Sequence, residues 1–190
     1  PHSAWPACDI SGAAPENTVL PVDAGQVKLG KSFDDEYYGW DNEYGQLPIE
    51  VNDFSASQFL VSNQEFLQFV DAGGYQDPSY WTDEGKRWLD FTKHKMPRFW
   101  RLENGQYLQR NLTKEIPLPL SWPVEVNYLE AKAFCNWKDS STEDFVRLPT
   151  EAEWQILRDQ LDTDLTDWAK APGNINLEHF ASSCPVDKFK

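Results

Sequence analysis

Cysteine and histidine are scarce in this sequence, which limits the disulfide and metal sites that the chain can build. It has three of each among 190 residues. Cys8, Cys135 and Cys184 lie far apart and form no C-x-x-C pair, so neither a disulfide framework nor a zinc site is predicted. None of the histidines has HExxH-type spacing. We therefore predict no metal site within the chain, and a reducing, cytoplasmic location suits its unpaired cysteines.

The cysteines differ in their sequence surroundings. Cys135 lies on the apolar side of an expected helix, where a thiol behaves as a small hydrophobic group. Cys184 follows two serines in an expected loop, so it is the better candidate for a reactive thiol.

Basic residues are also few, since 17 lysines and arginines face 31 aspartates and glutamates, a formal net charge of −14. Such a charge repels a phosphate backbone, so nucleic acid is not expected as a partner. No apolar run approaches the roughly 20 residues of a membrane-spanning helix. Residues 1–5 include no initiator methionine, basic n-region or apolar h-region. We expect an internal starting point and no signal peptide.

Common catalytic signatures are missing, because the sequence has no GxSxG elbow, Walker loop or dinucleotide-binding fingerprint. Aromatic residues, in contrast, make up 14% of the chain and include nine tryptophans. Disordered segments lack such residues, so we predict a folded protein. The 13 prolines favour a loop-rich fold, here of the α+β class.

The first third of the chain predicts strands around a loop. Residues 1–18 are small, polar and proline-containing, which is typical of a linker. An apolar stretch starts at Val19–Val22, and residues 26–30 and 49–54 alternate as strands do. Residues 37–45 mix aromatic, acidic and glycine residues, which favours a structured loop.

Three cap pairs mark the starts of expected helices. In each pair a side-chain oxygen can accept from the amide three residues later, while a glutamate reaches back to the cap. The pairs are Ser62 with Glu65, Asn127 with Glu130, and Thr150 with Glu153. Gly73-Gly74 is expected to end the first helix.

The remaining helix predictions concern buried faces. The third helix is expected to bury Trp154, Leu157 and Leu161. Residues 75–122 are rich in aromatics but show no clean period. We expect loops and short turns there, with a short helix near 83–89 and aromatics that belong to a core.

Segment 39–45 supplies the candidates for the wall of a substrate cleft, which are Trp40, Asp41, Asn42, Glu43 and Tyr44. The alternative interpretation is a loop whose Asp41, Asn42 and Glu43 side chains satisfy backbone amides. Two further acids, Glu151 and Glu153, fit the first turn of a helix, where they complement its dipole without catalysis. No catalytic residue can be assigned from these patterns.

Four segments, in order along the chain, resemble sulfatase-modifying-factor domains of the formylglycine-generating-enzyme type. Residues 22–25 resemble the opening P-x-G, residues 60–66 the helix start x-V-T-N-x-E-F, and residues 122–131 the motif x-P-V-x-x-V-S-W-x-x-A. Residues 147–154, R-L-P-T-E-A-E-W, match the hallmark of the family. The resemblance implies a C-type-lectin-like fold that is incomplete at its C-terminal end. Residues 19–190 would be the N-terminal and central part of the domain.

A narrower resemblance links the chain to the ovothiol-pathway 5-histidylcysteine sulfoxide synthases. It rests on residues 38–45, 125–137, 174–179 and 182–187. These enzymes are non-haem Fe(II) oxygenases that join cysteine sulfur to histidine imidazole with dioxygen, so cysteine and histidine are the implied small-molecule substrates.

The same resemblance implies that the chain is a fragment, inactive alone, which contains no cofactor of its own. The Fe(II) of the parent would be held by an HxxxH-type motif of a DinB-like domain preceding a linker at residues 1–18. The catalytic tyrosine would follow Lys190, so both missing parts are expected partners. Asn174 and Ile175 resemble a position that contributes to calcium binding in formylglycine-generating enzymes. The other ligands have no counterpart, and no calcium is predicted.

Two other functions stay open. One is a C-type-lectin-like module that binds a ligand without catalysis. The other is a formylglycine-generating oxidase, which uses a late cysteine pair for copper that is not visible in this sequence.

Overall fold

The computed structural model describes residues 6–141, 145–160 and 173–189, which divide into two compact units. The ribbon unit comprises Thr18–Gln58 and the described part of Pro149–Asp164; the helical unit comprises the described parts of Pro1–Asn17, Phe59–Leu148 and Leu165–Lys190. The mixed helix and strand content confirms the α+β prediction, while the lectin-like topology stays a prediction. No described helix is long and apolar enough to cross a membrane.

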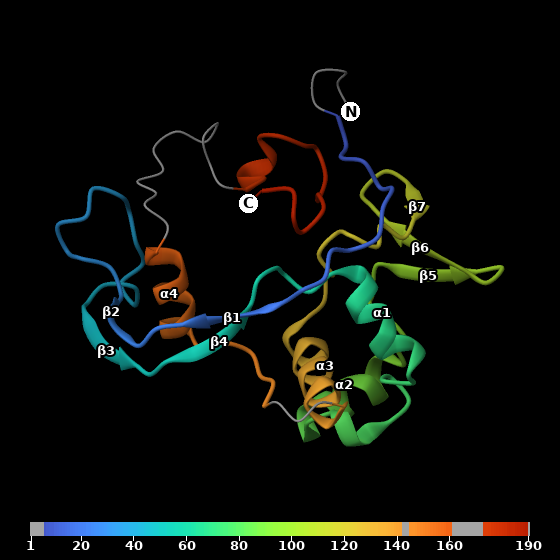
Figure 1. The fold of residues 1–190 in the computed structure, drawn as a ribbon, viewed down its shortest axis with the longest axis horizontal. Helices are drawn as coiled ribbons and strands as arrows, with labels where there is room; N and C mark the ends of the chain where they lie inside the picture. Colours follow the sequence, from blue (N-terminus) through green and yellow to red (C-terminus); the bar gives the residue numbers. More distant parts are fainter. Residues whose placement is uncertain (1–5, 142–144, 161–172, 190) are drawn as a thin grey trace. The chain divides into compact units, whose positions relative to one another are not determined.

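Two antiparallel strand pairs form the ribbon unit (Figure 1). The pairs are β1 (Val19–Val22) with β4 (Phe54–Ser57), and β2 (Gly25–Leu29) with β3 (Leu47–Val51). Because Val22 pairs with Phe54 and Gly25 with Val51, the short breaks between the strands lie opposite each other. β1 and β2 therefore make one arm of a ribbon, β3 and β4 make the other, and residues 30–46 join the arms.

The strand predictions are partly confirmed. β2 lies one residue before the predicted 26–30, the apolar stretch Val19–Val22 forms β1, and residues 37–45 form a loop. The single strand expected at 49–54 is wrong, because β3 ends at Val51 and β4 begins at Phe54. The intervening residues are asparagine and aspartate, which disfavour strands, so the pairing is interrupted there.

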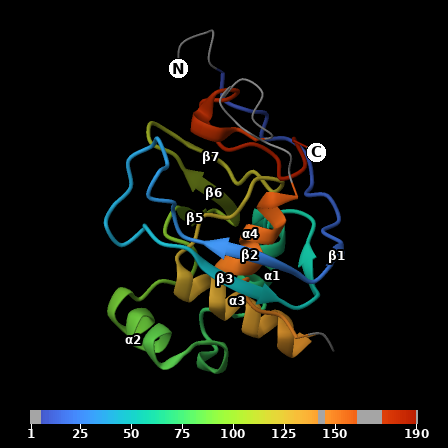
Figure 2. The ribbon, with the colours of Figure 1, turned by 90° about the vertical axis from the view of Figure 1, so that its left-hand side faces the viewer.

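Helix α4 (Glu151–Asp159) packs against β2 and β3 (Figure 2). Its predicted cap is confirmed: the Thr150 hydroxyl accepts from the Glu153 amide at 3.2 Å, and the Glu153 carboxylate accepts from the Thr150 amide at 2.7 Å. The buried residues of the helix and the strands form one apolar cluster, which consists of Val22, Val27, Val51, Ala152 and Ile156.

The predicted buried face of α4 is partly wrong. Trp154 is 54% exposed, Leu157 packs at the edge of the cluster, and Leu161 lies outside the described residues. Ile156 is buried instead, and it packs on β2, where a Cβ added at Gly25 would lie 3.4 Å from Ile156 Cδ1, in ordinary van der Waals contact.

The helical unit combines helices with a small antiparallel sheet. The helices are α1 (Asn63–Asp71), α2 (Asp83–Thr92) and α3 (Tyr128–Ser141), with short 3-10 turns at Pro78–Tyr80 and Ile175–Leu177. The sheet has the order β5 (Trp100–Glu103), β6 (Gln106–Arg110) and β7 (Glu115–Pro117). The caps predicted for α1 and α3 are confirmed.

The prediction of loops and short turns throughout residues 75–122 is wrong. The segment contains the whole sheet, and the short helix expected near 83–89 extends to Thr92. A local signal for the first hairpin exists in Asn104-Gly105, whose φ angles are +50° and +79°. This dipeptide favours a tight hairpin turn, but the strands beside it are too short to show an alternating pattern.

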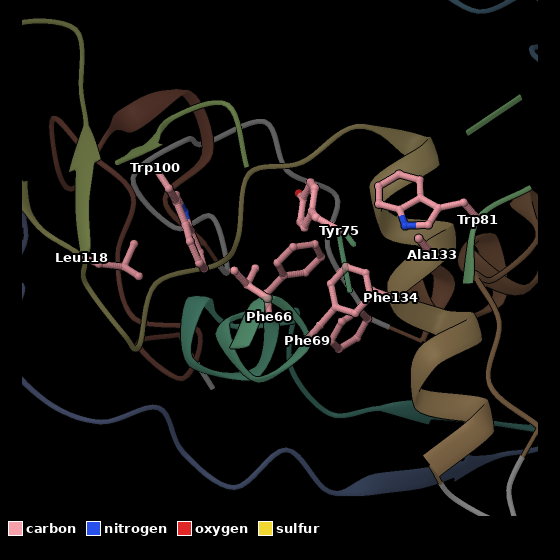
Figure 3. Close-up of a cluster of buried hydrophobic side chains, with 9 residues drawn as sticks. Phe66, Phe69, Tyr75, Trp81, Trp100, Leu118, Ala133 and Phe134 are labelled. Atoms are coloured by element: carbon pink, nitrogen blue, oxygen red, sulfur yellow. The ribbon is translucent and has the colours of Figure 1, made fainter. Parts of the chain in front are cut away.

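Aromatic side chains fill the core of the helical unit (Figure 3). Phe66 and Phe69 of α1 are 1% and 0% exposed, and Phe66 stacks on Phe134 of α3 with ring centroids 5.3 Å apart. Tyr75, Trp81 and Trp100 belong to the same cluster, which confirms the core prediction for these aromatics of 75–122, whereas Phe91 is 88% exposed. The chain passes so close to this core at Gly74 that a Cβ there would lie 2.1 Å from the Phe69 ring.

A buried carboxylate links the end of α1 to the start of α3. Glu130 is 3% exposed and accepts from the Tyr75 hydroxyl at 2.6 Å and from the Asn127 amide at 2.9 Å. Burial, reinforced by the neighbouring Glu130 charge, raises the pKa of Tyr75 well above its usual value. The phenol therefore stays protonated and continues to donate to Glu130.

This arrangement predicts a loss of stability at alkaline pH. The unfolded chain releases the tyrosine proton near pH 10, whereas folded Tyr75 retains it. The free energy contributed by this raised pKa is thus fully present below about pH 10 and declines above it, by up to about 1.4 kcal/mol per pH unit. Tyr75→Phe is expected to be less stable than the native chain at neutral pH, by about 1–3 kcal/mol, but to lose stability less steeply above pH 10.

Urea unfolding of both chains between pH 8 and 11 measures the two slopes. Tyr128→Phe is the control, because Tyr128 is 62% exposed on α3. Equal slopes for the native chain and Tyr75→Phe would contradict the assigned role of the buried phenol.

Candidate ligand groove

The loop that joins the arms of the ribbon is closed at its base. The Lys31 amide donates to the Glu43 carbonyl at 2.8 Å, and the Gly45 amide donates to the Lys31 carbonyl at 2.9 Å. The backbone at Gly30 approaches the backbone at Gly45 so closely that a Cβ on Gly30 would lie 2.4 Å from the Gly45 carbonyl oxygen. Residues 31–44, hereafter the ribbon loop, therefore form a compact loop with adjoining ends, a form that often carries function.

Side chains inside the ribbon loop hold its backbone. The Glu43 carboxylate accepts from the Trp40 amide at 2.7 Å, and the Asp41 carboxylate accepts from the Asn42 amide at 2.9 Å. The Tyr44 hydroxyl accepts from the Gly39 amide at 3.1 Å. Asp41 and Glu43 thus satisfy backbone amides, as the alternative interpretation of this segment predicted.

The charge of the ribbon loop is acidic. Lys31 is its only basic residue, and the Lys31 ammonium lies 2.9 Å from the Asp35 carboxylate. The Tyr37 amide, and after it Lys31, hold the pKa of Asp35 below its usual value. Because Lys31 is paired in this way, its charge leaves little net positive potential in the loop.

A groove of about 730 Å³ lies in the ribbon unit, between the ribbon loop, the adjoining strands and α4. Of the predicted cleft residues, Asn42, Glu43 and Tyr44 line it. Trp40 and Asp41 do not line it, although both are exposed on the loop. The assignment of the predicted residues to a substrate cleft stays a prediction.

The lining residues that were not predicted from the sequence include Lys31, Tyr38 and Glu151. Tyr38 lies just before the predicted segment, so a wider window would have included it. Glu151 is brought to the groove by α4, and no local pattern could have connected it with residues a hundred positions earlier. The lining side chains together offer carboxylate, amide, phenol and ammonium groups, which bind polar ligands by hydrogen bonds.

The histidines that the structure describes do not form a metal centre. The His94 ring contacts Trp88, with centroids 5.3 Å apart, and the His179 ring contacts Phe189 at 5.1 Å. Within the described ranges no group of three or more His, Cys, Asp and Glu residues could hold a metal ion. These residues therefore do not fit an iron site of the kind that the resemblance implies for a parent protein.

Asn174 organises a turn in the helical unit. Its side-chain oxygen accepts from the His179 and Phe180 amides at 3.0 and 2.9 Å, and its side-chain nitrogen donates to the Ser182 carbonyl at 2.7 Å. The amide oxygen is thus engaged by two backbone donors.

Comparison with known proteins identifies the family. Residues 9–158 match the sulfatase-modifying factor enzyme 1-like domain. Since this match covers most of the chain, the protein belongs to the family of sulfatase-modifying factor enzyme 1-like domains.

Individual relatives give a narrower picture. The chain is 32% identical over 127 residues to the hercynine oxygenase of Mycolicibacterium thermoresistibile and 31% identical over 162 residues to that of Mycobacterium tuberculosis. These alignments cover 67% and 85% of this chain but 27% and 34% of the relatives, so the chain spans about a third of their length. It is also 24% identical over 186 residues to the mouse inactive C-alpha-formylglycine-generating enzyme 2, covering 87% of this chain and 56% of that protein.

The close approach at the base of the ribbon loop predicts a specific effect of Gly30→Ala. The new Cβ would overlap the Gly45 carbonyl, and Gly30 has a φ of +95°, which disfavours a side chain. We expect a loss of about 2–4 kcal/mol in the free energy of unfolding and faster proteolysis within residues 31–44.

Gly45→Ala is the matched control, since Gly45 has a φ of +127° but a Cβ added there would meet no atom within 4 Å. It carries only the backbone strain and should cost about 1–2 kcal/mol. Denaturant unfolding and limited proteolysis compare the two variants. An equal cost for both would show that the contact at the loop base is unimportant.

Proposed function

We propose that the chain is part of a sulfoxide synthase, an oxygenase that joins a cysteine-type sulfur to an imidazole ring with dioxygen. We propose further that its imidazole substrate is histidine, as in ovothiol biosynthesis, and that it acts in the cytoplasm. The observation that carries the proposal is the similarity to two hercynine oxygenases. Hercynine is a methylated histidine, so the relatives' name supports an imidazole substrate. The resemblance of residues 38–45 and 174–187 to ovothiol-pathway enzymes favours histidine itself.

The contribution proposed for this chain is to bind and orient substrate. When bound, Fe(II) would supply the activation of dioxygen, but the described residues do not fit an iron site. We therefore propose that a DinB-like domain of the same polypeptide holds the metal and that a later segment completes the pocket. The groove beside the ribbon loop would then form one wall of the substrate site, where Asn42, Tyr38 and the acids Glu43 and Glu151 meet the polar groups of an amino acid.

A second candidate is a module that binds a ligand in the same groove without catalysis. The observation that favours it is the mouse relative, whose name describes an inactive member of the family and which aligns with 87% of this chain. A formylglycine-generating oxidase is a weaker third candidate. The sequence shows no late cysteine pair of the kind that such oxidases use for copper.

The proposal predicts a coupling reaction in the full-length protein that contains this chain. Purified protein loaded with Fe(II) is supplied with cysteine, dioxygen and either histidine or hercynine, and products are identified by mass spectrometry. We expect a histidine–cysteine sulfoxide that requires both iron and dioxygen. Coupling of hercynine alone would reject the ovothiol assignment and retain the sulfoxide synthase. No coupling of either imidazole, with histidine still bound, would favour the binding module.

The groove predicts a difference between two adjacent tyrosines. Tyr38 lines the groove and Tyr37 does not, although they are 77% and 64% exposed. In the full-length protein, Tyr38→Ala should lower kcat/KM for the imidazole substrate roughly fivefold to tenfold, equivalent to about 1 kcal/mol of lost contact. Tyr37→Ala should change kcat/KM less than about twofold.

Steady-state kinetics measure both variants, with thermal unfolding as the check on folding. An equal loss of kcat/KM in the two variants, or none in Tyr38→Ala, would remove the groove from the substrate site.

A further inference from the structure

Two segments from opposite ends of the chain meet in the helical unit (Figures 1 and 2). The Ala181 amide donates to the Pro6 carbonyl at 3.0 Å, and the Cys8 amide donates to the Ser182 hydroxyl at 2.8 Å. These bonds join positions that are more than 170 residues apart in sequence. Residues 6–10 and 180–186 are therefore held side by side.

Trp122 fixes this meeting point. It is 1% exposed, and its indole N–H donates to the Asp9 carbonyl at 3.1 Å. On the other side, the Val186 amide donates to the carbonyl of Ser121 at 2.8 Å. Both segments are thus anchored on the same short stretch of chain, and neither can shift without breaking a bond to it.

Each segment brings one cysteine to the cluster around Trp122. Cys8 is 8% exposed and belongs to the buried part of the cluster, and the half-buried Cys184 packs against it. Both are free thiols. Cys135, in contrast, lies in α3 and is not a member of this cluster.

We propose that Cys8 and Cys184 are an oxidative modification site, at which a low-molecular-weight disulfide converts the two thiols into an intramolecular disulfide. The cross-link would join the N-terminal and C-terminal segments over Trp122. In the reduced chain hydrogen bonds and apolar contacts hold these segments together.

The reaction proceeds by two thiol–disulfide exchanges. Cys184, the more exposed thiol, loses its proton to solvent and attacks one sulfur of the oxidant, for example glutathione disulfide. A mixed disulfide forms and the first glutathione leaves as a thiolate. Cys8 then loses its proton and attacks the Cys184 sulfur, so that the protein disulfide forms and the second glutathione leaves. The two protein thiols lose two electrons, and the oxidant gains them as two molecules of glutathione.

The environment of Cys184 sets the pH dependence of the first exchange. Burial, and then the neighbouring Cys8, raise the pKa of Cys184 above its usual value. The charge of Lys188 opposes this shift, because it lowers the pKa. Since the thiolate is the attacking species, the rate should rise about tenfold per pH unit from neutral pH upward.

The test is to incubate the 190-residue chain with glutathione disulfide at pH 8.5 and analyse it without reduction. Intact mass should fall by two hydrogen atoms, and peptide mapping should recover the Cys8 and Cys184 peptides joined. The cross-link should form on the order of tenfold faster in the folded chain than in urea, because folding holds the two segments together. The oxidised chain should also unfold at a higher temperature than the reduced one.

Three variants separate the outcomes. Cys8→Ser should stop at a stable glutathione adduct on Cys184, Cys184→Ser should form no cross-link, and Cys135→Ser should behave as the native chain does. A stable adduct on Cys184 in the native chain would overturn the proposal, as would a cross-link that includes Cys135 or one that forms no faster in the folded chain. If a serine variant fails to fold, two comparisons still test the proposal. They are the cross-link in the native chain against that in Cys135→Ser, and the rate of cross-linking in the folded chain against that in urea.

Discussion

The two backbone hydrogen bonds between Lys31 and the segment 43–45 are the constraint on which the candidate site depends. They close the ribbon loop at its base, and Gly30 permits the close approach that they require. With the base closed, the Glu43 carboxylate can reach the Trp40 amide, and the loop presents Tyr38 and Asn42 to the groove. The site is thus built from backbone contacts first, and its side chains are positioned as a consequence.

Acidic residues in this chain serve mainly to organise its backbone. Glu65, Glu130 and Glu153 each reach back to the cap of a helix, and Glu130 also accepts from the buried Tyr75 hydroxyl. Within the ribbon loop, Asp41 and Glu43 accept from neighbouring amides. A net charge of −14 therefore does not indicate a cluster of catalytic acids.

What could be predicted from sequence was whatever depends on a few neighbouring residues. The helix caps were predicted correctly because a hydroxyl or amide and a glutamate three residues later are sufficient to define them. The short strands β5, β6 and β7 were missed because three to five residues of mixed polarity carry no readable period. The exposure of Trp154 and the position of Glu151 in the groove depend on how α4 packs on β2 and β3. Packing between elements that are far apart in sequence leaves no local pattern in the sequence.

The central claim is that the groove beside the ribbon loop forms part of the site for an imidazole substrate. A crystal structure of the full-length protein with histidine bound tests it most directly. The account predicts that histidine lies within hydrogen-bonding distance of at least one groove residue, with Tyr38, Asn42 and Glu151 the first to inspect. Histidine bound in a pocket that includes no residue of the ribbon loop would contradict the account.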